Sequence, residues 1–555
     1  MMNIEGASVR TLLFGAALLA VAAAVPFIGA LDYPFLHDDM WAVVDNPLVD
    51  DGVDPARIFA SNSWGNRPEY PHMHYRPLSV LTLSVTHALF GEAPAPFRLT
   101  NTAMHAAVTV LLFLLLIRLS VRPIAAFAGS LWFAVHPVHV EAVMFAVNRE
   151  ELMATLFYLG AVHVMVPSLG ISGIPARPMS AARMALVCLL MALGFLSKET
   201  AATLPVLVLA ISLWWPLRPR LAWPRAMALT GALFLTLVAC LTLRYEVLGR
   251  VLSSYLPWQD NPLVLVHGFA RVWSALGVLA ESARLMVAPF YLTVDYGYNV
   301  LGFPSGGRFL ASVAGLFILV GAVFAVFRLA RTSRVASLGL LLALVSWLPF
   351  SNLLFPNSII LSERTLYLPS AGVAICLAGL LDGFSDPVRG SRVVGNVLAA
   401  AVFTWCLMMG AVAHDRVLAH RSAVSLFGSS LANRPGSTRL HDNLGLAYMK
   451  EGHPAKSEEH LRRALAIDPT NAAAHNNLGL LLGGTGRAKE AAMEFSLALR
   501  LRPAMEEALT NLCWLLVRTG EYEAALKPCA AARRKGGPVD DALRLIEAKG
   551  SSGRE

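Results

Sequence analysis

Charge is scarce in this chain. Charged residues make up 15% of its 555 residues, hydrophobic residues make up 56%, and the mean hydropathy is +0.57. Soluble domains carry about 25% charged residues, and a water-soluble core of this size cannot bury so much apolar surface. The composition excludes disordered and collagen-like chains and predicts that most of the chain lies in a membrane.

Cysteine is also scarce, with six residues in the whole chain, which excludes a disulfide-stabilised scaffold. Four of the six lie in apolar runs and are expected to be core residues: Cys188, Cys240, Cys376 and Cys406. Cys513 and Cys529 lie close together in a polar region. The spacing leaves open whether these two form a disulfide.

Several ligand-binding motifs are missing. The sequence contains no Walker loop, no GxGxxG pattern and no His/Cys zinc spacing. The net charge of +8 is spread over short arginine patches between apolar runs, whereas nucleic-acid binding needs a clustered basic face. We therefore expect no nucleotide or nucleic-acid site, and the sequence shows no zinc-binding motif.

Eleven apolar runs are expected to cross the roughly 30 Å of hydrocarbon in a bilayer. They lie at about 12–31, 99–117, 123–140, 147–166, 184–198, 200–217, 226–247, 308–328, 335–350, 366–382 and 393–413. The first run is expected to be an uncleaved helix, with a cleaved signal peptide as the alternative. Charged residues interrupt the run 269–293, which we expect to be amphipathic or re-entrant.

The arginines between these runs predict the orientation of the chain. Cytoplasmic loops are enriched in Lys and Arg, and the patches all fall on one side if the N-terminus is cytoplasmic and eleven runs span. The patches are Arg118 with Arg122, Arg177 with Arg183, Arg218 with Arg220 and Arg225, Arg328 with Arg331 and Arg334, and Arg389 with Arg392. Two long loops, 32–98 and 248–307, then lie outside together with the C-terminal region.

The C-terminal region repeats every 34 residues. The recurring residues include Asn443, Asn477 and Asn511, and Pro435, Pro469 and Pro503. This period is typical of tetratricopeptide repeats, in which each helical hairpin buries its apolar face against its neighbours. We expect the three asparagines to line a groove and bond the backbone of an acceptor peptide. Alternatively, they satisfy polar groups between helices.

These patterns predict an all-α protein with four segments. Residues 1–413 form a polytopic membrane bundle of about eleven helices, and residues 414–437 form a degenerate repeat or linker. Residues 438–537 form an α-solenoid of three tetratricopeptide repeats, and residues 538–555 form a C-terminal tail.

Two adjacent carboxylates, Asp38 and Asp39, follow the first apolar run. They are either the start of a solvated loop or a helix cap, or a general base or metal ligand at the membrane face. The segment after Arg76 is apolar on one side and is expected to lie on the membrane surface, where it either frames a lipid substrate or tethers the loop.

Further charged and histidine residues lie at the predicted outer ends of the apolar runs. They are His136, His139, Glu141, Arg149, Lys198, Glu199, Glu363 and Arg364. Charges at membrane depth cost several kcal/mol unless they are paired or functional. Sequence neighbours rarely face each other on a helix, so we expect Lys198 and Arg364 to pair with distant residues. Such a set fits a phosphate-bearing lipid, with cations holding the phosphate and a carboxylate taking a proton.

These residues resemble those of the transmembrane and tetratricopeptide-repeat-containing protein O-mannosyltransferases, which are GT-C class membrane glycosyltransferases. The matching segments are Phe35–Asp39, Tyr75–Leu78, His136–Val143, Leu196–Glu199, Asn352–Pro356 and Ser362–Ser370. They occur in order across the whole membrane domain, and the repeat domain matches in kind.

The resemblance implies an inverting sugar transfer from a polyprenyl-phosphate donor, with no firm cofactor and an open question about a divalent metal. Asp38 or Asp39 would deprotonate the acceptor hydroxyl. From charge and side alone, we expect Arg364, Lys198 and Arg149 to neutralise the lipid phosphate, and Glu141 and His139 to orient the sugar or the base. The same donor phosphate and sugar site is expected to include Arg76, His136, Glu199 and Glu363. The expected partners are the lipid donor, an acceptor protein held by the repeats, and membrane lipids.

Lysine is rare beside arginine, and there is no N-glycosylation sequon, which indicates a bacterial inner-membrane protein with periplasmic repeats. Mannose is then the default sugar. One alternative is the same chemistry on a surface polysaccharide or lipid, and another is a non-enzymatic scaffold for envelope assembly.

Overall fold

A computed structural model describes residues 8–65, 74–169, 178–214, 223–251, 258–297, 309–384 and 392–552. All the regular secondary structure in these residues is helical. The chain divides into two compact units, a membrane unit that ends at Ser422 and a repeat unit that begins at Ala423. Of the arginines used above for orientation, Arg177, Arg218, Arg220 and Arg389 lie outside the described residues.

Twelve longer helices build the membrane unit in the part of the chain that the structure describes. They are α1 (Val9–Ile28), α5 (Pro94–Arg118), α6 (Pro123–Ala134), α8 (Arg149–Leu169), α9 (Ala181–Ser197), α10 (Leu204–Trp214), α11 (Trp223–Leu248), α12 (Gly268–Val287), α13 (Phe309–Thr332), α14 (Arg334–Trp347), α15 (Tyr367–Phe384) and α16 (Arg392–Ala419).

Helix α4, with 14 residues, and several shorter helices connect them or shape the loops. They are η1 (Met40–Val44), α2 (Pro47–Asp50), α3 (Pro55–Phe59), α4 (Pro77–Phe90), η2 (Pro137–His139), α7 (Val140–Met144), η3 (Ala146–Asn148), η4 (Glu199–Thr203), η6 (Pro262–Leu265), η8 (Leu348–Phe350) and η9 (Glu363–Leu366).

Six helices of the described residues are long and apolar enough to cross a membrane. They are Val9–Ile28, Pro94–Arg118, Ala146–Ser168, Ala226–Leu248, Phe309–Thr332 and Glu363–Phe384. A seventh span arises if α6 and the η2–α7 segment count as one helix, bent by 48°. The protein is therefore an integral membrane protein with several apolar helical spans.

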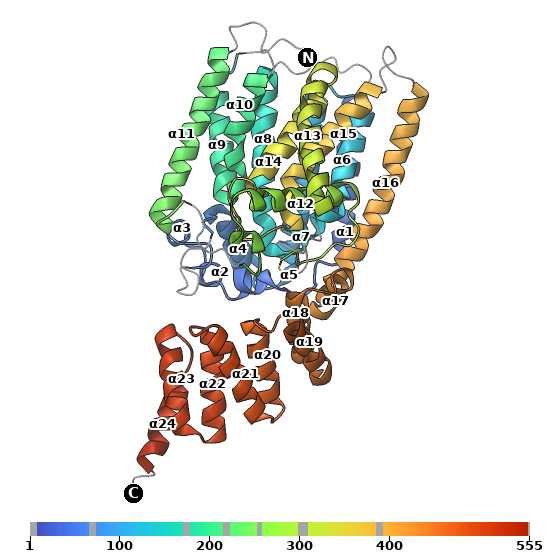
Figure 1. The fold of residues 1–555 in the computed structure, drawn as a ribbon. Helices are drawn as coiled ribbons and strands as arrows, with labels where there is room; N and C mark the ends of the chain where they lie inside the picture. The colour runs from blue at the N-terminus through green and yellow to red at the C-terminus, as the bar shows by residue number, and fades with distance from the viewer. Residues whose placement is uncertain are drawn as a thin grey trace. The chain divides into compact units, whose positions relative to one another are not determined.

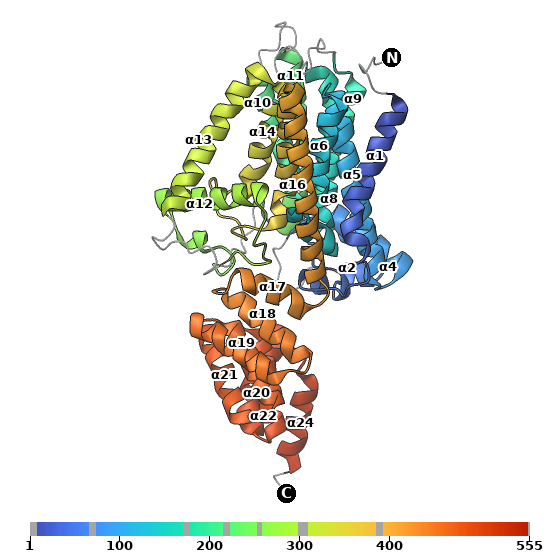
Figure 2. The ribbon, with the colours of Figure 1, turned by 90° about the vertical axis from the view of Figure 1, so that its right-hand side faces the viewer.

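The run that we expected not to span is α12. Figures 1 and 2 show α12 lying across the direction of its neighbours α13 and α14. Phe269 is largely exposed and stacks on Trp273, whereas Ala275 and Val278 are buried. One face of α12 is thus apolar and exposed while the other packs inward, as an amphipathic helix at a membrane surface does.

The repeat unit contains eight helices in the described residues. They are α17 (Ala423–Asn433), α18 (Thr438–Lys450), α19 (Pro454–Ile467), α20 (Ala472–Gly484), α21 (Ala488–Leu501), α22 (Glu506–Thr519), α23 (Tyr522–Lys535) and α24 (Asp540–Ser552). Helices α18 to α23 form three successive hairpins. Gly445 and Gly479 recur in α18 and α20 because Leu461 and Phe495 of the second helix fill the space beside them.

The segment expected as a C-terminal tail contains α24, which packs Ala542 and Ile546 into the core of the last hairpin. Cys513 and Cys529 form a disulfide that joins α22 to α23. Of the other cysteines, Cys240 and Cys406 are buried, while Cys188 and Cys376 are partly buried.

Helices α14 and α15 approach each other through glycines. A Cβ atom at Gly339 would lie 2.3 Å from the backbone nitrogen of Cys376, and one at Gly372 would lie 2.5 Å from the backbone nitrogen of Ala343. Small residues let membrane helices pack this closely. The pair supports η9, which precedes α15.

We predict that Gly339→Ala destabilises the membrane unit by about 1–3 kcal/mol, because the added methyl group forces two backbones apart. Gly321→Ala in α13 is the matched control, since nothing lies within 4 Å of the Cβ position there. Thermal unfolding in detergent, followed by size-exclusion chromatography, measures the difference. Equal melting temperatures for the two variants would contradict the packing.

Candidate active site

Polar and charged side chains from four separate segments meet around Arg364 of η9. Its Nη1 atom lies 3.2 Å from Oδ2 of Asp38, 3.1 Å from Oδ1 of Asn148 and 3.6 Å from Oε1 of Glu141. The Glu141 carboxylate also accepts hydrogen bonds from the Arg364 backbone N–H and from the Ser362 hydroxyl. The Arg364 guanidinium therefore contacts both the Asp38 and the Glu141 carboxylates. Residues distant in the sequence thus hold the Asp38 side chain in place.

Asp38 is the accessible carboxylate of this group. Its side chain is 32% exposed, and its Oδ1 atom lies 2.7 Å from Nδ1 of His37. Burial alone would raise the pKa of Asp38, but the charges of His37 and Arg364 hold it well below its usual range. The carboxylate is ionised at neutral pH and can accept a proton from a bound hydroxyl.

Asp39 has a different environment. Its side chain is fully buried, and its two oxygens accept hydrogen bonds from the backbone N–H groups of Ala146 and Val147 at 3.0 and 2.9 Å. Burial raises the pKa of Asp39 to about 6, in spite of these two hydrogen bonds. Asp39 therefore links the first outer loop to η3. Asp38 and Asp39, which the sequence analysis treated alike, thus have different environments in the structure.

A second group forms around Arg76, just before α4. Arg76 Nη1 lies 2.6 Å from Glu150, and Arg76 Nη2 lies 2.9 Å from Glu199. Lys198 Nζ lies 3.0 Å from Glu150 and 2.5 Å from Glu151. The expectation that Lys198 and Arg364 pair with residues distant in sequence is confirmed.

Arg244, in α11, completes the second group. Its Nη1 atom lies 2.5 Å from Oε1 of Glu199. Sequence analysis missed this residue because it lies inside a predicted span. The available signal was a single cation near the outer end of an apolar run, where a buried carboxylate partner is required.

Arg149 is fully buried and does not join either group. It donates hydrogen bonds to the Asn101 side chain, to the Thr82 carbonyl and to the Thr86 hydroxyl. These hydrogen bonds of the guanidinium link α4, α5 and α8. The expectation that Arg149 holds a phosphate is not supported by this position.

The two histidines of the third run lie in the core. His136 Nε2 lies 3.1 Å from the Met286 carbonyl, and His139 Nε2 lies 2.7 Å from the Ser370 hydroxyl. Both rings are buried. They pack helices together and do not face the carboxylate of Asp38 in the way that we expected.

Glu363 points away from its neighbour Arg364. Its Oε1 atom accepts hydrogen bonds from the Thr293 backbone N–H at 2.7 Å and from the Tyr296 hydroxyl at 2.9 Å. Its Oε2 atom lies 3.9 Å from Arg416 of α16. Glu363 therefore anchors the second outer loop and is not placed to contact a donor at Arg364.

The asparagines of the repeats bond to neighbouring hairpins. Asn477 donates a hydrogen bond to the Asp442 carboxylate at 2.9 Å, and Asn511 donates one to the Asn476 carbonyl at 3.0 Å. These contacts fit the alternative that the asparagines satisfy polar groups between helices. Asn443 occupies the same place in the first hairpin and is partly buried.

We predict that Asp39→Ala lowers stability by about 2 kcal/mol or more, because it leaves two buried N–H groups unpaired. Asp38→Asn is the matched variant and is expected to change stability by less than about 1 kcal/mol, since it removes a partly exposed ion pair. Thermal unfolding of both proteins in detergent tests this order. A larger loss for Asp38→Asn would reverse the two assignments.

Residues 438–471 match the family model described as tetratricopeptide repeat. The chain is 28% identical to the mouse protein O-mannosyl-transferase TMTC3 over 81% of this chain and 50% of that protein. It is 28% identical to the Caenorhabditis elegans protein O-mannosyl-transferase F38B6.6 over 81% of this chain and 62% of that protein.

Human protein O-mannosyl-transferase TMTC1 is 29% identical over 81% of this chain and 55% of that protein. The chain thus spans 50–62% of the length of these three relatives. The chain is thus similar to several protein O-mannosyl-transferases over 81% of its length, and part of its C-terminal region matches the tetratricopeptide-repeat model.

Proposed function

We propose that this protein is an integral-membrane glycosyltransferase that moves a sugar, by default mannose, from a polyprenyl-phosphate donor to Ser or Thr of an acceptor protein at the outer face of the membrane. The observation that carries the proposal is the partly exposed, ionised carboxylate of Asp38 beside the guanidinium of Arg364. A base and a phosphate-binding cation lie next to each other there, as a direct displacement of a sugar phosphate requires.

In the proposed reaction, Asp38 takes the proton of the acceptor hydroxyl as its oxygen attacks the anomeric carbon. The bond between that carbon and the phosphate oxygen breaks, and the lipid phosphate leaves with the electron pair. Arg364 would hold the negative charge that develops on the leaving group. No covalent intermediate is needed, so the sugar configuration inverts.

Arg364 is the cation best placed for this role. Its side chain is 17% exposed and lies beside the proposed base, whereas the side chain of Lys198 is only 4% exposed. Arg76 already bridges Glu150 and Glu199. We assign Lys198, Glu199 and Arg76 to positioning the loops around the donor, and Glu141 to orienting Arg364.

The proposal includes a topology of eleven spans with a cytoplasmic N-terminus. Helices α9, α14 with η8, η4 with α10, and α16 add four spans to the seven described above. The 17 residues of α9 reach about 26 Å at 1.5 Å per residue, which a locally thinned bilayer accommodates. Arg118 and Arg183 lie close enough to repel each other, which supports one common side for these two patches.

The disulfide of the last hairpin supports an outer location for the repeats. Disulfides persist in oxidising compartments such as the bacterial periplasm and are rare in the cytosol. We therefore place the repeats in the periplasm of a bacterium, where they would hold the acceptor protein near the membrane.

We predict that Asp38→Asn reduces sugar transfer by about 10²–10⁴-fold, the range for loss of a general base. Asp51→Asn is the control, because Asp51 lies in the same loop, is exposed and pairs with Arg57. Intact-glycopeptide mass spectrometry of envelope proteins compares both variants with wild type in a deletion strain, at matched membrane levels.

Full activity of Asp38→Asn would exclude Asp38 as the base. Absence of hexose on Ser or Thr in the wild-type strain, with altered surface glycans or lipids, would identify a non-protein acceptor.

We predict a pH effect for Arg364→Met. Arg364 holds the pKa of Asp38 below its usual range, so Asp38 stays ionised as the pH falls below the ordinary value for Asp. Removal of the guanidinium raises this pKa, and the acid limb of kcat/KM moves to higher pH. A profile measured in vesicles tests this shift, and an unmoved acid limb would contradict the pairing.

A further inference from the structure

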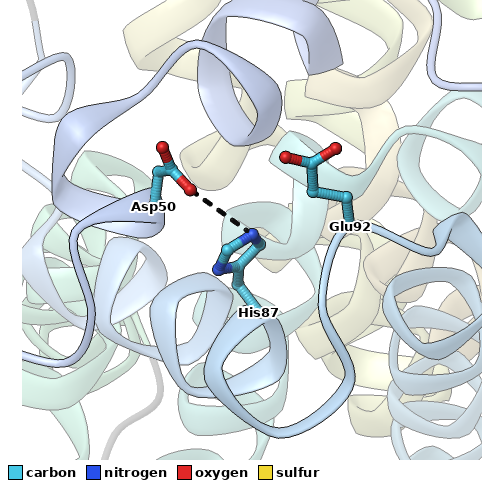
Figure 3. A group of neighbouring side chains, drawn as sticks. All are labelled: Asp50, His87 and Glu92. Atoms are coloured by element: carbon cyan, nitrogen blue, oxygen red, sulfur yellow. Dashed lines mark ion pairs between the residues drawn. The ribbon is translucent and has the colours of Figure 1, made fainter.

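Three residues of the first outer loop converge in a group that takes no part in the proposed reaction. Asp50 ends α2, His87 lies in the last turn of α4, and Glu92 follows α4. One ligand atom from each lies within 4.8 Å of the other two. Figure 3 shows the two carboxylates on either side of the His87 ring, with a dashed line from the ring to Asp50.

The backbone that carries these residues is fixed by packing. Leu48 and Val49 of α2 pack with Leu83 of α4 in one buried cluster. The Ser84 hydroxyl donates a hydrogen bond to the Gly52 carbonyl at 3.2 Å, which joins the chain after α2 to the middle of α4. The three side chains therefore approach each other from a rigid support.

A turn brings the third residue back over the second. Gly91 has φ +68°, and its N–H donates a hydrogen bond to the His87 carbonyl at 2.7 Å. A residue with a Cβ atom rarely adopts this φ, so the glycine lets the chain reverse at the end of α4. Glu92 consequently faces the ring of His87 and does not continue away from it.

The separations suit ligands of one cation. Nε2 of His87 lies 3.8 Å from Oδ1 of Asp50, which is too long for a hydrogen bond. Two ligand atoms bound tetrahedrally to one zinc ion at 2.0–2.1 Å lie about 3.4 Å apart. The ligand atoms of the three residues lie within 4.8 Å of one another, and the exposed side chains of Asp50 and Glu92 can move closer by rotating, while the His87 ring is only 14% exposed and stays in place.

The charges of the three side chains suit a cation. Two carboxylates face one imidazole, whereas the adjacent Asp51 carboxylate is balanced by Arg57 at 2.7 Å. A nitrogen ligand disfavours Ca²⁺ and Mg²⁺, which prefer oxygen ligands. One imidazole and two carboxylates are ligands for zinc or a similar transition metal.

We propose that Asp50, His87 and Glu92 bind one divalent transition-metal ion, with zinc as the best match and water completing its coordination. Helix α4 begins directly after Arg76, and His87 lies about 16 Å further along at 1.5 Å per residue. The ion is therefore remote from the charged group around Arg76. It clamps α2 to the end of α4 and stabilises the loop that also carries Asp38.

The test measures zinc binding to the full-length protein in detergent after chelator treatment and removal of the chelator. Isothermal titration and metal analysis of wild type are compared with Asp50→Asn, Glu92→Gln and the double variant. Both substitutions are on exposed side chains, so the variants are expected to fold. Asp51→Asn is the matched control, and hydrogen exchange of residues 47–52 and 86–92 gives a readout independent of activity.

Wild type and Asp51→Asn are expected to bind one zinc ion more than the double variant. The affinity of each single variant is expected to fall by at least the roughly 10–100-fold that loss of an outer-shell partner costs. Zinc is also expected to slow exchange in both segments of wild type and of Asp51→Asn, but not in the double variant. Equal zinc binding by wild type and the double variant, or no change in exchange, would overturn the proposal.

Discussion

The pairing of the buried charges around Arg76 and Arg364 is the constraint on which the rest of the membrane unit depends. An unpaired charge at membrane depth costs several kcal/mol, so these cations contact carboxylates, whereas Arg149 is satisfied by uncharged oxygen atoms. Lys198 reaches Glu150 and Glu151 of α8, and Arg76 joins α8 to η4 through Glu150 and Glu199. The pairs cross between segments, and the positions of the loops are therefore set by the same contacts that neutralise the charges.

This constraint explains which parts of the site the sequence could predict. Charges at the ends of apolar runs marked Lys198, Glu199 and Arg364 as residues that need partners. The structure divides them between the group around Arg76 and the group around Arg364. The sequence could not separate Asp38 from Asp39, since only the fold brings the N–H groups of Ala146 and Val147 to one carboxylate and Arg364 to the other.

The same reasoning shows why other expectations failed. His136 and Arg149 form hydrogen bonds with backbone carbonyls of neighbouring helices. A sequence pattern does not distinguish such structural hydrogen bonds from substrate binding. The residues of the proposed metal site were missed because Asp50 is far from His87 in the sequence, although His87 and Glu92 lie close together. The repeats were predictable because their period is local and needs no long-range contact.

Glu363 and Arg364 are adjacent in the chain but contact two different long loops. Glu363 is held by Thr293 and Tyr296 of the second outer loop, while Arg364 is held by Asp38 of the first. Asp38 and Thr293, which are 255 residues apart in the sequence (293 − 38), are thus linked through two residues that share one peptide bond. A ligand that draws Arg364 away from Asp38 would also pull on the backbone of Glu363, because the two residues are adjacent. Ligand binding beside the first loop is therefore coupled to the position of the second loop through this backbone.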